Sequence, residues 1–553
     1  MNMKKYFLLL LISNIAVNEC KCQYELIIRN GIIYDGSGNT PFKGDIAING
    51  DSIAAIGNLE KTTAKKEIDA KGRAIAPGFI NVLGHSEGSL IQDSSSQSDI
   101  RQGVTIEIMG EGSAGPFTPQ MTEELKKQFG VELRTLGDFY NYLEKKGVSC
   151  NVACFVGSGN IREFVIGEDN RRATSAQLDS MCFLVKQAMQ EGALGVSSAL
   201  IYPPDVFNST DELIAECKVA SKYGGSYASH MRSEGNRLYE GLEELITIAK
   251  QANIHAEIYH LKAAGKDNWV KMDSVIKRVE RARTDGLNIT ADMYTYLAGA
   301  TGLTTCFPPS LQDGGFGKLW ERLQNPIIRD SMKRTMNTNA MDWENNYYAV
   351  GSPDKILMLQ FAQDSLKKFT GKTLAQVAKI RGTSPEETAM DLIVQDSTRI
   401  EVAYFLMSEE NIKKQLALPW VSFCSDAGSY SMDSIFMTFN PHPRAFGNFA
   451  RVIGKYVRDE HLLTLQQAVY KLSKLPATNL KLLKRGELKV GYYADVLVFD
   501  SAKVKDYATF DNPHQYSTGM IDVFVNGVQV LKDGVHTGAT PGRFLKGPGY
   551  NMK

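Results

Sequence analysis

Apolar and polar positions alternate in two different ways along the chain, which divides it into two kinds of structure. Near the start, short runs with strand-like alternation are separated by turn pairs such as Asn30-Gly31. The end of the chain shows the same strand-like runs separated by turns, with strands expected at Ala494–Asp500 and Val523–Gly527. Since neither piece could complete a fold alone, we expect the two ends to form one small β-sandwich from residues 23–76 and 484–553.

Between these ends, apolar strand-like runs alternate with helical stretches, of which Thr174–Glu191 and Ser209–Tyr223 are the clearest. Repeated strand-then-helix units predict a parallel sheet with helices outside it, and about eight such units over residues 77–483 fit a (β/α)8 TIM barrel. The rhythm breaks at about 303–348, which we interpret as an insertion able to cover the functional face of the barrel. The expected strand runs are Ile80–Val82, Thr105–Met109, Val152–Phe155, Gly195–Ser198, Ser226–Ser229, Ala256–Tyr259, Asn288–Asp292, Val402–Phe405 and Trp420–Phe423.

The first residues read as a targeting segment. Lys4-Lys5 precede the apolar run Phe7–Val17, which is too short to span a bilayer and is typical of a signal peptide. We therefore assign residues 1–22 to a signal peptide cleaved before Gln23 and expect an exported protein, periplasmic or secreted. Two alternatives stay open: a buried N-terminal element, or a lipidated Cys20 behind a poor lipobox.

Composition narrows the class of partner. The chain has 553 residues, 43% of them hydrophobic, with 62 basic and 62 acidic side chains. The balanced charge argues against nucleic acid or an anionic membrane surface as the main partner. No later apolar run is long enough for an integral membrane segment, so a small-molecule substrate is expected, with the oligomeric state undetermined. Six cysteines outside the signal peptide are interpreted as small buried hydrophobes: Cys150, Cys154, Cys182, Cys217, Cys306 and Cys424.

Two histidines end strand-like runs in successive units. His230 closes Ser226–His230, and His260 follows some thirty residues later at the end of the next run. In a barrel the carboxyl ends of neighbouring strands share one face, so both imidazoles would be placed to bind one metal ion. A single strand-end histidine is more often structural, but two in adjacent units favour a metal site.

A third strand end carries Ser425-Asp426. A carboxylate there could bind a metal and accept the proton of a metal-bound water, whose pKa falls to near 7. The alternative is a helix N-cap after a strand, a position that aspartate also favours.

The motifs of the whole chain after residue 22 resemble those of the N-acyl-D-amino-acid deacylase (D-aminoacylase) branch of the amidohydrolase superfamily. The matching motifs run in family order: Ala76–Asn81, Gln102–Thr105, Gly225–Gly235, His260–Lys262, Ala291–Tyr296, Ser425–Gly428, Pro441–Arg444, Leu475–Ala477 and Arg485-Gly486. The resemblance implies a TIM barrel with a β-sandwich from both termini, and hydrolysis of the amide bond of an N-acyl-D-amino acid.

The resemblance also implies residue roles. His230 and His260 match the two strand-end zinc ligands of the family, and Asp426 matches its general base and acid. Three further residues match positions near the substrate: Lys262, Tyr294 and Arg232. Lys262 is the candidate for binding the free carboxylate of the substrate, with an ordinary solvated lysine as the alternative.

The sequence departs from the family at two ligand positions. Leu83 stands where the first histidine of the His-x-His pair belongs, so only His85 remains of it. The Gly-Asn-Cys-Gly motif with its ligand cysteine is replaced by Met109–Ser113, in which Glu111 is the natural substitute because a carboxylate is a good zinc ligand. Its alternative is a glutamate in a solvated glycine turn.

We therefore predict one Zn²⁺ per chain, bound by Glu111, His230 and His260, with His85 near the site as a possible further ligand. The segment 192–198 contains no lysine for a carbamate bridge between two metals. The predicted function is hydrolysis of N-acyl-D-amino acids. The alternatives are a dipeptidase or cyclic-amide hydrolase of the same superfamily, and a non-catalytic binding protein on this fold.

Overall fold

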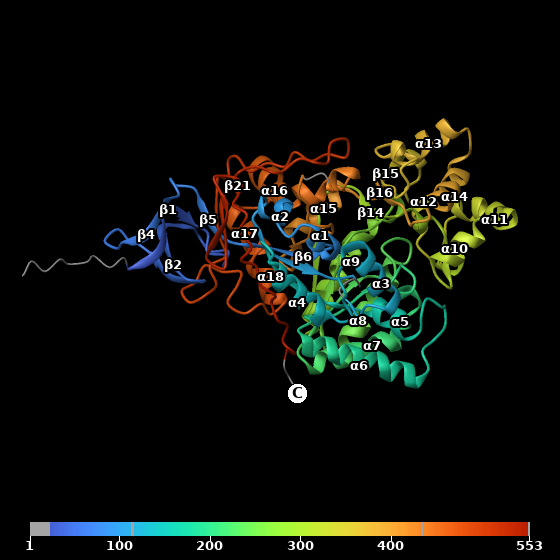
Figure 1. Cartoon of the computed structure of the whole chain (residues 1–553), viewed down its shortest axis with the longest axis horizontal. Helices are drawn as coiled ribbons and strands as arrows, with labels where there is room; N and C mark the ends of the chain where they lie inside the picture. The colour runs from blue at the N-terminus through green and yellow to red at the C-terminus, as the bar shows by residue number, and fades with distance from the viewer. Residues whose placement is uncertain (1–22, 112–114, 433–434, 551–553) are drawn as a thin grey trace, which may run out of the picture.

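The structure, a computed structural model, describes residues 23–111, 115–432 and 435–550. The predicted signal peptide, residues 1–22, lies outside the described residues, as does Gly112 beside Glu111. Along the long axis of the molecule, the strands near the N-terminus lie at one end, a barrel occupies the middle, and the helices α10–α14 lie at the other end (Figure 1).

The middle part is a closed barrel of parallel strands, which confirms the predicted (β/α)8 fold. Each neighbouring pair of strands is parallel, and β8 and β9 form one barrel strand interrupted at Phe155. Closure between the last and first strands is made by the Asp426 amide, which donates to the Leu83 carbonyl at 2.9 Å. The barrel strands are β6 (Phe79–Gly84), β7 (Val104–Met109), β8 (Asn151–Cys154), β9 (Val156–Gly157), β10 (Gly195–Ala199), β11 (Ser226–His230), β12 (His255–Ile258), β13 (Ile289–Met293) and β17 (Val421–Phe423).

Helices cover the outside of the barrel. The two that the sequence indicates most clearly are α6 (Ser175–Glu191) and α7 (Thr210–Lys222), and each starts in a capping box that satisfies its first amides. The other helices of this part are α1 (Glu87–Gln92), α2 (Gln97–Ile100), α3 (Pro119–Phe129), α4 (Leu136–Lys146), α5 (Ser158–Val165), α8 (Leu238–Ala252), α9 (Met272–Thr284), α15 (Glu409–Ala417), α16 (Arg444–Arg451), α17 (Leu465–Leu472) and α18 (Lys474–Asn479).

The insertion is larger than the predicted 303–348. A separate antiparallel sheet, ordered β14-β16-β15, packs with five helices around a core of its own. The prediction that Val402–Phe405 is a barrel strand is wrong, because Glu401–Tyr404 is the central strand of this second sheet. A short apolar run looks the same in either sheet, so periodicity could not separate them. The elements are β14 (Gly299–Gly302), α10 (Phe316–Arg322), α11 (Pro326–Met336), α12 (Asn346–Ala349), β15 (Ile356–Gln360), α13 (Leu374–Arg381), α14 (Pro385–Asp396) and β16 (Glu401–Tyr404).

The two ends of the chain meet in one small β domain, as expected. Strand β18 from the C-terminal part pairs antiparallel with β5 from the N-terminal part, and pairing continues unbroken through a nine-stranded sheet. Its core, which includes Ile28, Ile46 and Val496, is separate from the barrel core. The strands are β1 (Tyr24–Ile33), β2 (Phe42–Asn49), β3 (Ser52–Gly57), β4 (Ala64–Asp69), β5 (Ala74–Pro77), β18 (Val496–Phe499), β19 (Met520–Val525), β20 (Val528–Lys532) and β21 (Val535–His536).

The cysteines in the described part of the chain are all free. Five are buried and Cys182 is half-buried, in agreement with their interpretation as small hydrophobes. Within the ranges that the structure describes, no helix combines the length and the apolar character needed to cross a membrane.

Candidate active site

The carboxyl ends of the barrel strands bring together residues that are far apart in the sequence. Glu111 follows β7, His230 ends β11, His260 lies just beyond β12, and Asp426 lies beyond β17. His230 and His260 are buried, and with Glu111 they form a group whose ligand atoms all lie within 4.8 Å of one another. The structure thus places the three residues predicted to bind the metal in one cluster.

Three of these residues adopt left-handed backbone conformations that side chains other than glycine rarely take. The φ angles are +57° at Glu111, +34° at His260 and +49° at Asp426. Each costs on the order of 1–3 kcal/mol and persists only where the surroundings fix the backbone. Asp292 does so at His260, since its Oδ1 accepts a hydrogen bond from the His260 amide at 2.7 Å. The strain turns each side chain into the space above the barrel.

The geometry of Glu111, His230 and His260 fits a zinc ion. Glu111 Oε1 lies 2.7 Å from His260 Nε2 and 3.2 Å from His230 Nδ1, and the two nitrogens are 3.1 Å apart. Two imidazole nitrogens this close can share only one hydrogen between them, so the arrangement is more natural for atoms that bind a common cation. Two nitrogens and one carboxylate oxygen are a ligand set of catalytic zinc sites.

Glu234 contacts both histidines on their outer sides. Its Oε1 lies 3.1 Å from His260 Nδ1, and its Oε2 lies 3.4 Å from His230 Nε2. Burial alone raises the pKa of Glu234, but the neighbouring charges, first His230 and then Lys262, lower it to about 2. One carboxylate therefore orients both metal-facing imidazoles, a role that carboxylates commonly have in zinc sites. The sequence analysis missed this role, although Glu234 stands four residues after His230.

The local electrostatics favour positive charge at this point. Burial alone lowers the pKa of His260, and the neighbouring Lys262 ammonium lowers it further. The surrounding carboxylates, Asp426 foremost, outweigh both effects and raise the pKa to about 10. Such a surplus of negative charge attracts a bound cation.

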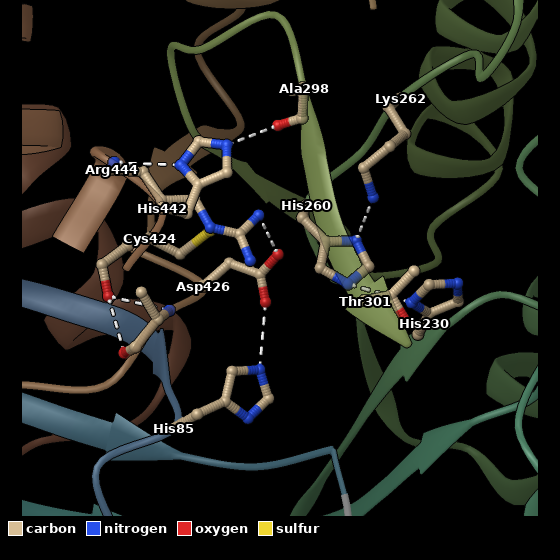
Figure 2. Close-up of polar contacts among 12 residues, drawn as sticks. His85, His230, His260, Lys262, Ala298, Thr301, Cys424, Asp426, His442 and Arg444 are labelled. Carbon is tan, nitrogen blue, oxygen red and sulfur yellow. Dashed lines mark hydrogen bonds and ion pairs between the residues drawn. The ribbon is translucent and has the colours of Figure 1, made fainter. Parts of the chain in front are cut away.

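Asp426 lies between His85 and Arg444, as Figure 2 shows. Its Oδ2 is 2.6 Å from Arg444 Nη1, and its Oδ1 is 3.0 Å from His85 Nε2. Burial alone raises the pKa of Asp426, but the Arg444 and His260 charges outweigh burial and hold it well below the ordinary aspartate value. Asp426 is therefore an ionised carboxylate that faces the ligand cluster, and it is not an N-cap, since no helix starts there.

A second group of ligand atoms overlaps the first. His85, Glu111 and Asp426 also place their ligand atoms within 4.8 Å of one another, with Glu111 common to both groups. Leu83 contributes only its backbone, since its side chain is fully buried in the barrel core. In this second group Arg444 already supplies the positive charge next to Asp426, which disfavours a second cation there.

A cavity of about 500 Å³ opens above the cluster. Lys262 lies in its wall, where its Nζ donates to Glu234 Oε1 at 2.7 Å and lies 2.7 Å from His260 Nδ1. Tyr294 also faces the cavity, and its buried hydroxyl has no hydrogen-bond partner among the described residues. Burial raises the pKa of Tyr294 to about 12, so the hydroxyl keeps its proton and can donate a hydrogen bond.

The structure does not bring Arg232 into this cavity. Its guanidinium donates to Glu244 at 2.8 Å and to the carbonyls of Val206 and Asn208, at 2.7 and 2.8 Å. These bonds fix it in the wall of a neighbouring cavity of about 430 Å³. The resemblance implied a position near the substrate for Arg232; Arg444, from the Pro441–Arg444 motif, lines the cavity above the cluster.

The insertion contributes to the cavity wall. Glu344 is half-buried there, and it accepts hydrogen bonds from Ser233 Oγ at 2.7 Å and from the Glu234 amide at 2.6 Å. Arg399 and Glu401, next to and within β16, also line the cavity. The insertion thus contributes side chains to the cavity above the metal-binding cluster.

A parallel eight-stranded barrel with nitrogen and carboxylate ligands at its strand ends is the arrangement of a metal-dependent enzyme on a TIM barrel. In agreement, the profile of the Amidohydrolase family matches residues 358–531. D-aminoacylase of Alcaligenes xylosoxydans xylosoxydans is 30% identical over 528 residues, which cover 94% of this chain and 97% of that protein. N-acyl-D-glutamate deacylase of the same organism is 29% identical over 532 residues, which cover 94% of this chain and 96% of that protein.

A solved structure extends the likeness to three dimensions. N-acyl-D-glutamate deacylase of Bordetella bronchiseptica, in complex with zinc and a phosphonate inhibitor, superposes with a TM-score of 0.79 at 27% identity. The match covers 95% of this chain and 99% of that one. The chain belongs to the D-aminoacylase branch of the amidohydrolase family.

Proposed function

We propose that this protein is a zinc-dependent hydrolase that cleaves the amide bond of N-acyl-D-amino acids into a carboxylate and a free D-amino acid. The observation that carries the proposal is that one cavity holds the Glu111, His230 and His260 cluster, an ionised Asp426 and two buried cationic side chains. The relatives named D-aminoacylase and N-acyl-D-glutamate deacylase support the same substrate class.

The chemistry at the scissile bond is divided between the metal and the protein. Zinc bound by Glu111, His230 and His260 supplies a Lewis acid for the carbonyl oxygen and lowers the pKa of water to near 7. Asp426, held ionised by Arg444, accepts the proton of the attacking water and later donates it to the leaving amine nitrogen. The hydroxyl of Tyr294, which has kept its proton, donates a hydrogen bond to the oxygen that becomes negative.

The free carboxylate of the substrate has two cationic candidates in the cavity. The Lys262 ammonium donates one hydrogen to Glu234, and since His260 Nδ1 carries a hydrogen when His260 binds metal through Nε2, the other two hydrogens of the ammonium are open to a ligand. Arg444 is buried, and its Nε has no hydrogen-bond partner among the described residues. Both cations lie on the faces of the Tyr294 ring, at 5.7 and 4.4 Å from its centroid. We assign carboxylate binding to this pair, with Arg444 in the role that the family resemblance implied for Arg232.

The test is turnover of matched N-acetyl-D- and N-acetyl-L-amino acids by the zinc-loaded enzyme, compared with Asp426→Asn. We expect hydrolysis of D-isomers only. The variant should keep its fold and its zinc but lose at least about a hundredfold in kcat, because general acid–base catalysis contributes about 10²–10⁴. If dipeptides or cyclic amides were cleaved faster than N-acetyl-D-amino acids, the enzyme would instead be a dipeptidase or a cyclic-amide hydrolase. Zinc binding without turnover of any panel member would favour a binding protein.

We further propose one zinc per chain. The Arg444 charge beside Asp426 disfavours a second cation in the His85 group, and Leu83 removes a ligand from it. Elemental analysis after gel filtration should give a zinc-to-protein ratio near one, and a stable ratio of two would contradict the assignment.

We also propose that the protein is exported to the periplasm or secreted. The support is the sequence pattern of residues 4–17 and the cleavage position before Gln23. N-terminal sequencing of the mature protein should start at Gln23, and a chain that keeps Met1 in the cytoplasm would contradict export.

A further inference from the structure

A second cluster of buried oxygen atoms lies outside the active-site cavity, between β7 and the segment that follows β6. Glu107 on β7 is fully buried, and Asp99 in α2 is 2% exposed. Three serine side chains surround them, at the ends of different loops: Ser86, Ser96 and Ser429. Each of these serines is at least 99% buried. The proposed mechanism uses none of these residues.

Several oxygen atoms of this cluster have no hydrogen-bond partner, whereas the two Asp99 oxygens accept hydrogen bonds from Asn81 and Ser98. Both carboxylate oxygens of Glu107, and the hydroxyls of Ser86, Ser96 and Ser429, have no hydrogen-bond partner among the described residues. The same three hydroxyls are nevertheless close enough to Glu107 to lower its pKa, and Ser429 acts on Asp99 as well. The hydroxyls therefore lie beside the Glu107 carboxylate while their hydrogen-bonding capacity is unmet.

Buried oxygen atoms whose hydrogen bonds are unmet can be satisfied by a metal ion. Oxygen ligands lie about 2.3–2.6 Å from Ca²⁺, so a single ion can contact several carboxylate and hydroxyl oxygens at once. The charge points the same way. Burial is the largest influence on the pKa of Asp99 and of Glu107 and raises both, and none of the other main influences is a basic side chain. Two buried carboxyl groups without a counter-charge are costly.

We propose that Glu107, Asp99 and the hydroxyls of Ser86, Ser96 and Ser429 bind a hard divalent cation, Ca²⁺, in a structural site distinct from the zinc cluster. The proposed ligand atoms are all oxygens, which suits calcium and not zinc, and the Cys150 thiol beside Glu107 is engaged by the Val104 carbonyl, to which its Sγ donates at 3.4 Å. Ca²⁺ accepts about six to eight oxygen ligands, and the lower end of that range is supplied by both oxygens of Glu107, one oxygen of Asp99 and the three hydroxyls. Two carboxylates balance its charge.

The proposed calcium site lies next to the loops that carry His85 and Asp426. Ser86 directly follows His85, and Ser429 lies three residues after Asp426. Asn81 joins the same region, since its Nδ2 donates to Asp99 Oδ1 at 3.3 Å and to Ser425 Oγ at 2.8 Å. A cation here ties the loop that carries His85 to the loop that carries Asp426. It therefore stabilises the backbone that positions the general base.

The test is the metal content of the full-length purified protein, passed through chelator-treated buffer and measured by mass spectrometry. We expect about one Ca²⁺ per chain in addition to zinc. Treatment with EGTA followed by resupply of zinc should lower the Tm by several degrees, and CaCl₂ should restore it while choline chloride should not. Absence of retained calcium together with a Tm indifferent to CaCl₂ would overturn the proposal in favour of buried water. Retention of Na⁺ or K⁺ instead would overturn the divalent assignment.

Two variants make the test specific. Glu107→Gln should lose the calcium and the CaCl₂ dependence of the Tm while keeping its zinc, and Ser96→Ala provides a milder change should the first variant not fold. Glu216→Gln is the matched control, since Glu216 is also fully buried with both oxygens unpartnered, but it lies on α7 away from this cluster. The control should retain the calcium. Equal calcium in all three variants would place the ion elsewhere and refute the site.

Discussion

Glu234 offers the sharpest test of how the zinc cluster is held together. It touches no reacting atom, yet its two oxygens face His260 Nδ1 at 3.1 Å and His230 Nε2 at 3.4 Å, while Lys262 Nζ lies 2.7 Å from Oε1. When both histidines bind metal through their other nitrogens, each presents an N–H to Glu234. The carboxylate then accepts from three donors at once, which an isosteric Glu234→Gln substitution cannot do.

The expected magnitude follows from this geometry. A glutamine has one acceptor oxygen, so its NH₂ group must face a histidine N–H or the Lys262 ammonium, and at least one buried donor loses its partner. Loss of a carboxylate that orients a metal-binding histidine typically costs about 10–100-fold in metal affinity, which corresponds to about 1.4–2.7 kcal/mol. Since one carboxylate serves both histidines here, we expect the upper end of that range.

The assay is competition for zinc between the protein and a chromogenic chelator at pH 7, where Glu234 with a pKa of about 2 is ionised. Glu216→Gln serves as the control, because burial raises the pKa of Glu216 to about 8 and the substitution replaces a group that is already mostly neutral. Zinc affinity in Glu234→Gln within threefold of the control would refute the assignment. A loss of affinity with an unchanged circular dichroism spectrum would support it.

Three further predictions concern other parts of the molecule. Arg444→Lys should raise the KM for N-acyl-D-amino acids at least about tenfold but change the KM of their methyl esters much less. The reason is that the guanidinium is expected to bind the free carboxylate in a bidentate contact, which lysine cannot make. Equal effects on the acid and the ester would contradict that role. Burial, with Lys481 and Arg283, lowers the pKa of His255 to about 4, so His255 stays neutral in the folded protein and contributes stability that is present above its unfolded pKa of about 6.5 and is lost as the pH falls to about 4. Between pH 7 and 4, the free energy of unfolding of His255→Gln should therefore fall by on the order of 3 kcal/mol less than that of the wild type. Denaturant unfolding measures both, and an equal fall in the two proteins would refute the prediction. Removal of zinc should lower the Tm. Zinc at a free concentration near a thousand times the Kd should restore about 4 kcal/mol of stability. A calorimetric Tm that does not depend on the zinc concentration would contradict coupling of metal binding to folding.

The alternation of strand and helix signals was sufficient to predict the barrel. Each strand–helix unit carries its own local signals: a buried apolar run, a capping serine or threonine, and helical spacing, as at Thr174 and Ser209. The strand-end positions of His230, His260 and Asp426 then followed, because carboxyl ends of parallel barrel strands always share one face. Glu111 was found from the family resemblance, because it stands shortly after β7 where the family has a ligand cysteine.

Tertiary structure decided what these local signals leave open. The run Val402–Phe405 is equally apolar in either sheet, and only long-range pairing with β14 and β15 placed it in the insertion. Arg232 and Arg444 each stand two residues after a histidine in the sequence. An ion pair with Glu244 holds Arg232 outside the cavity, whereas an ion pair with Asp426 holds Arg444 inside it. The order of residues thus determined the barrel and its metal-facing strand ends, since those depend on local periodicity. The partners of the charged side chains depend on contacts between segments more than a hundred residues apart, such as Glu111 with His260 and His85 with Asp426, and only the folded chain brings these together.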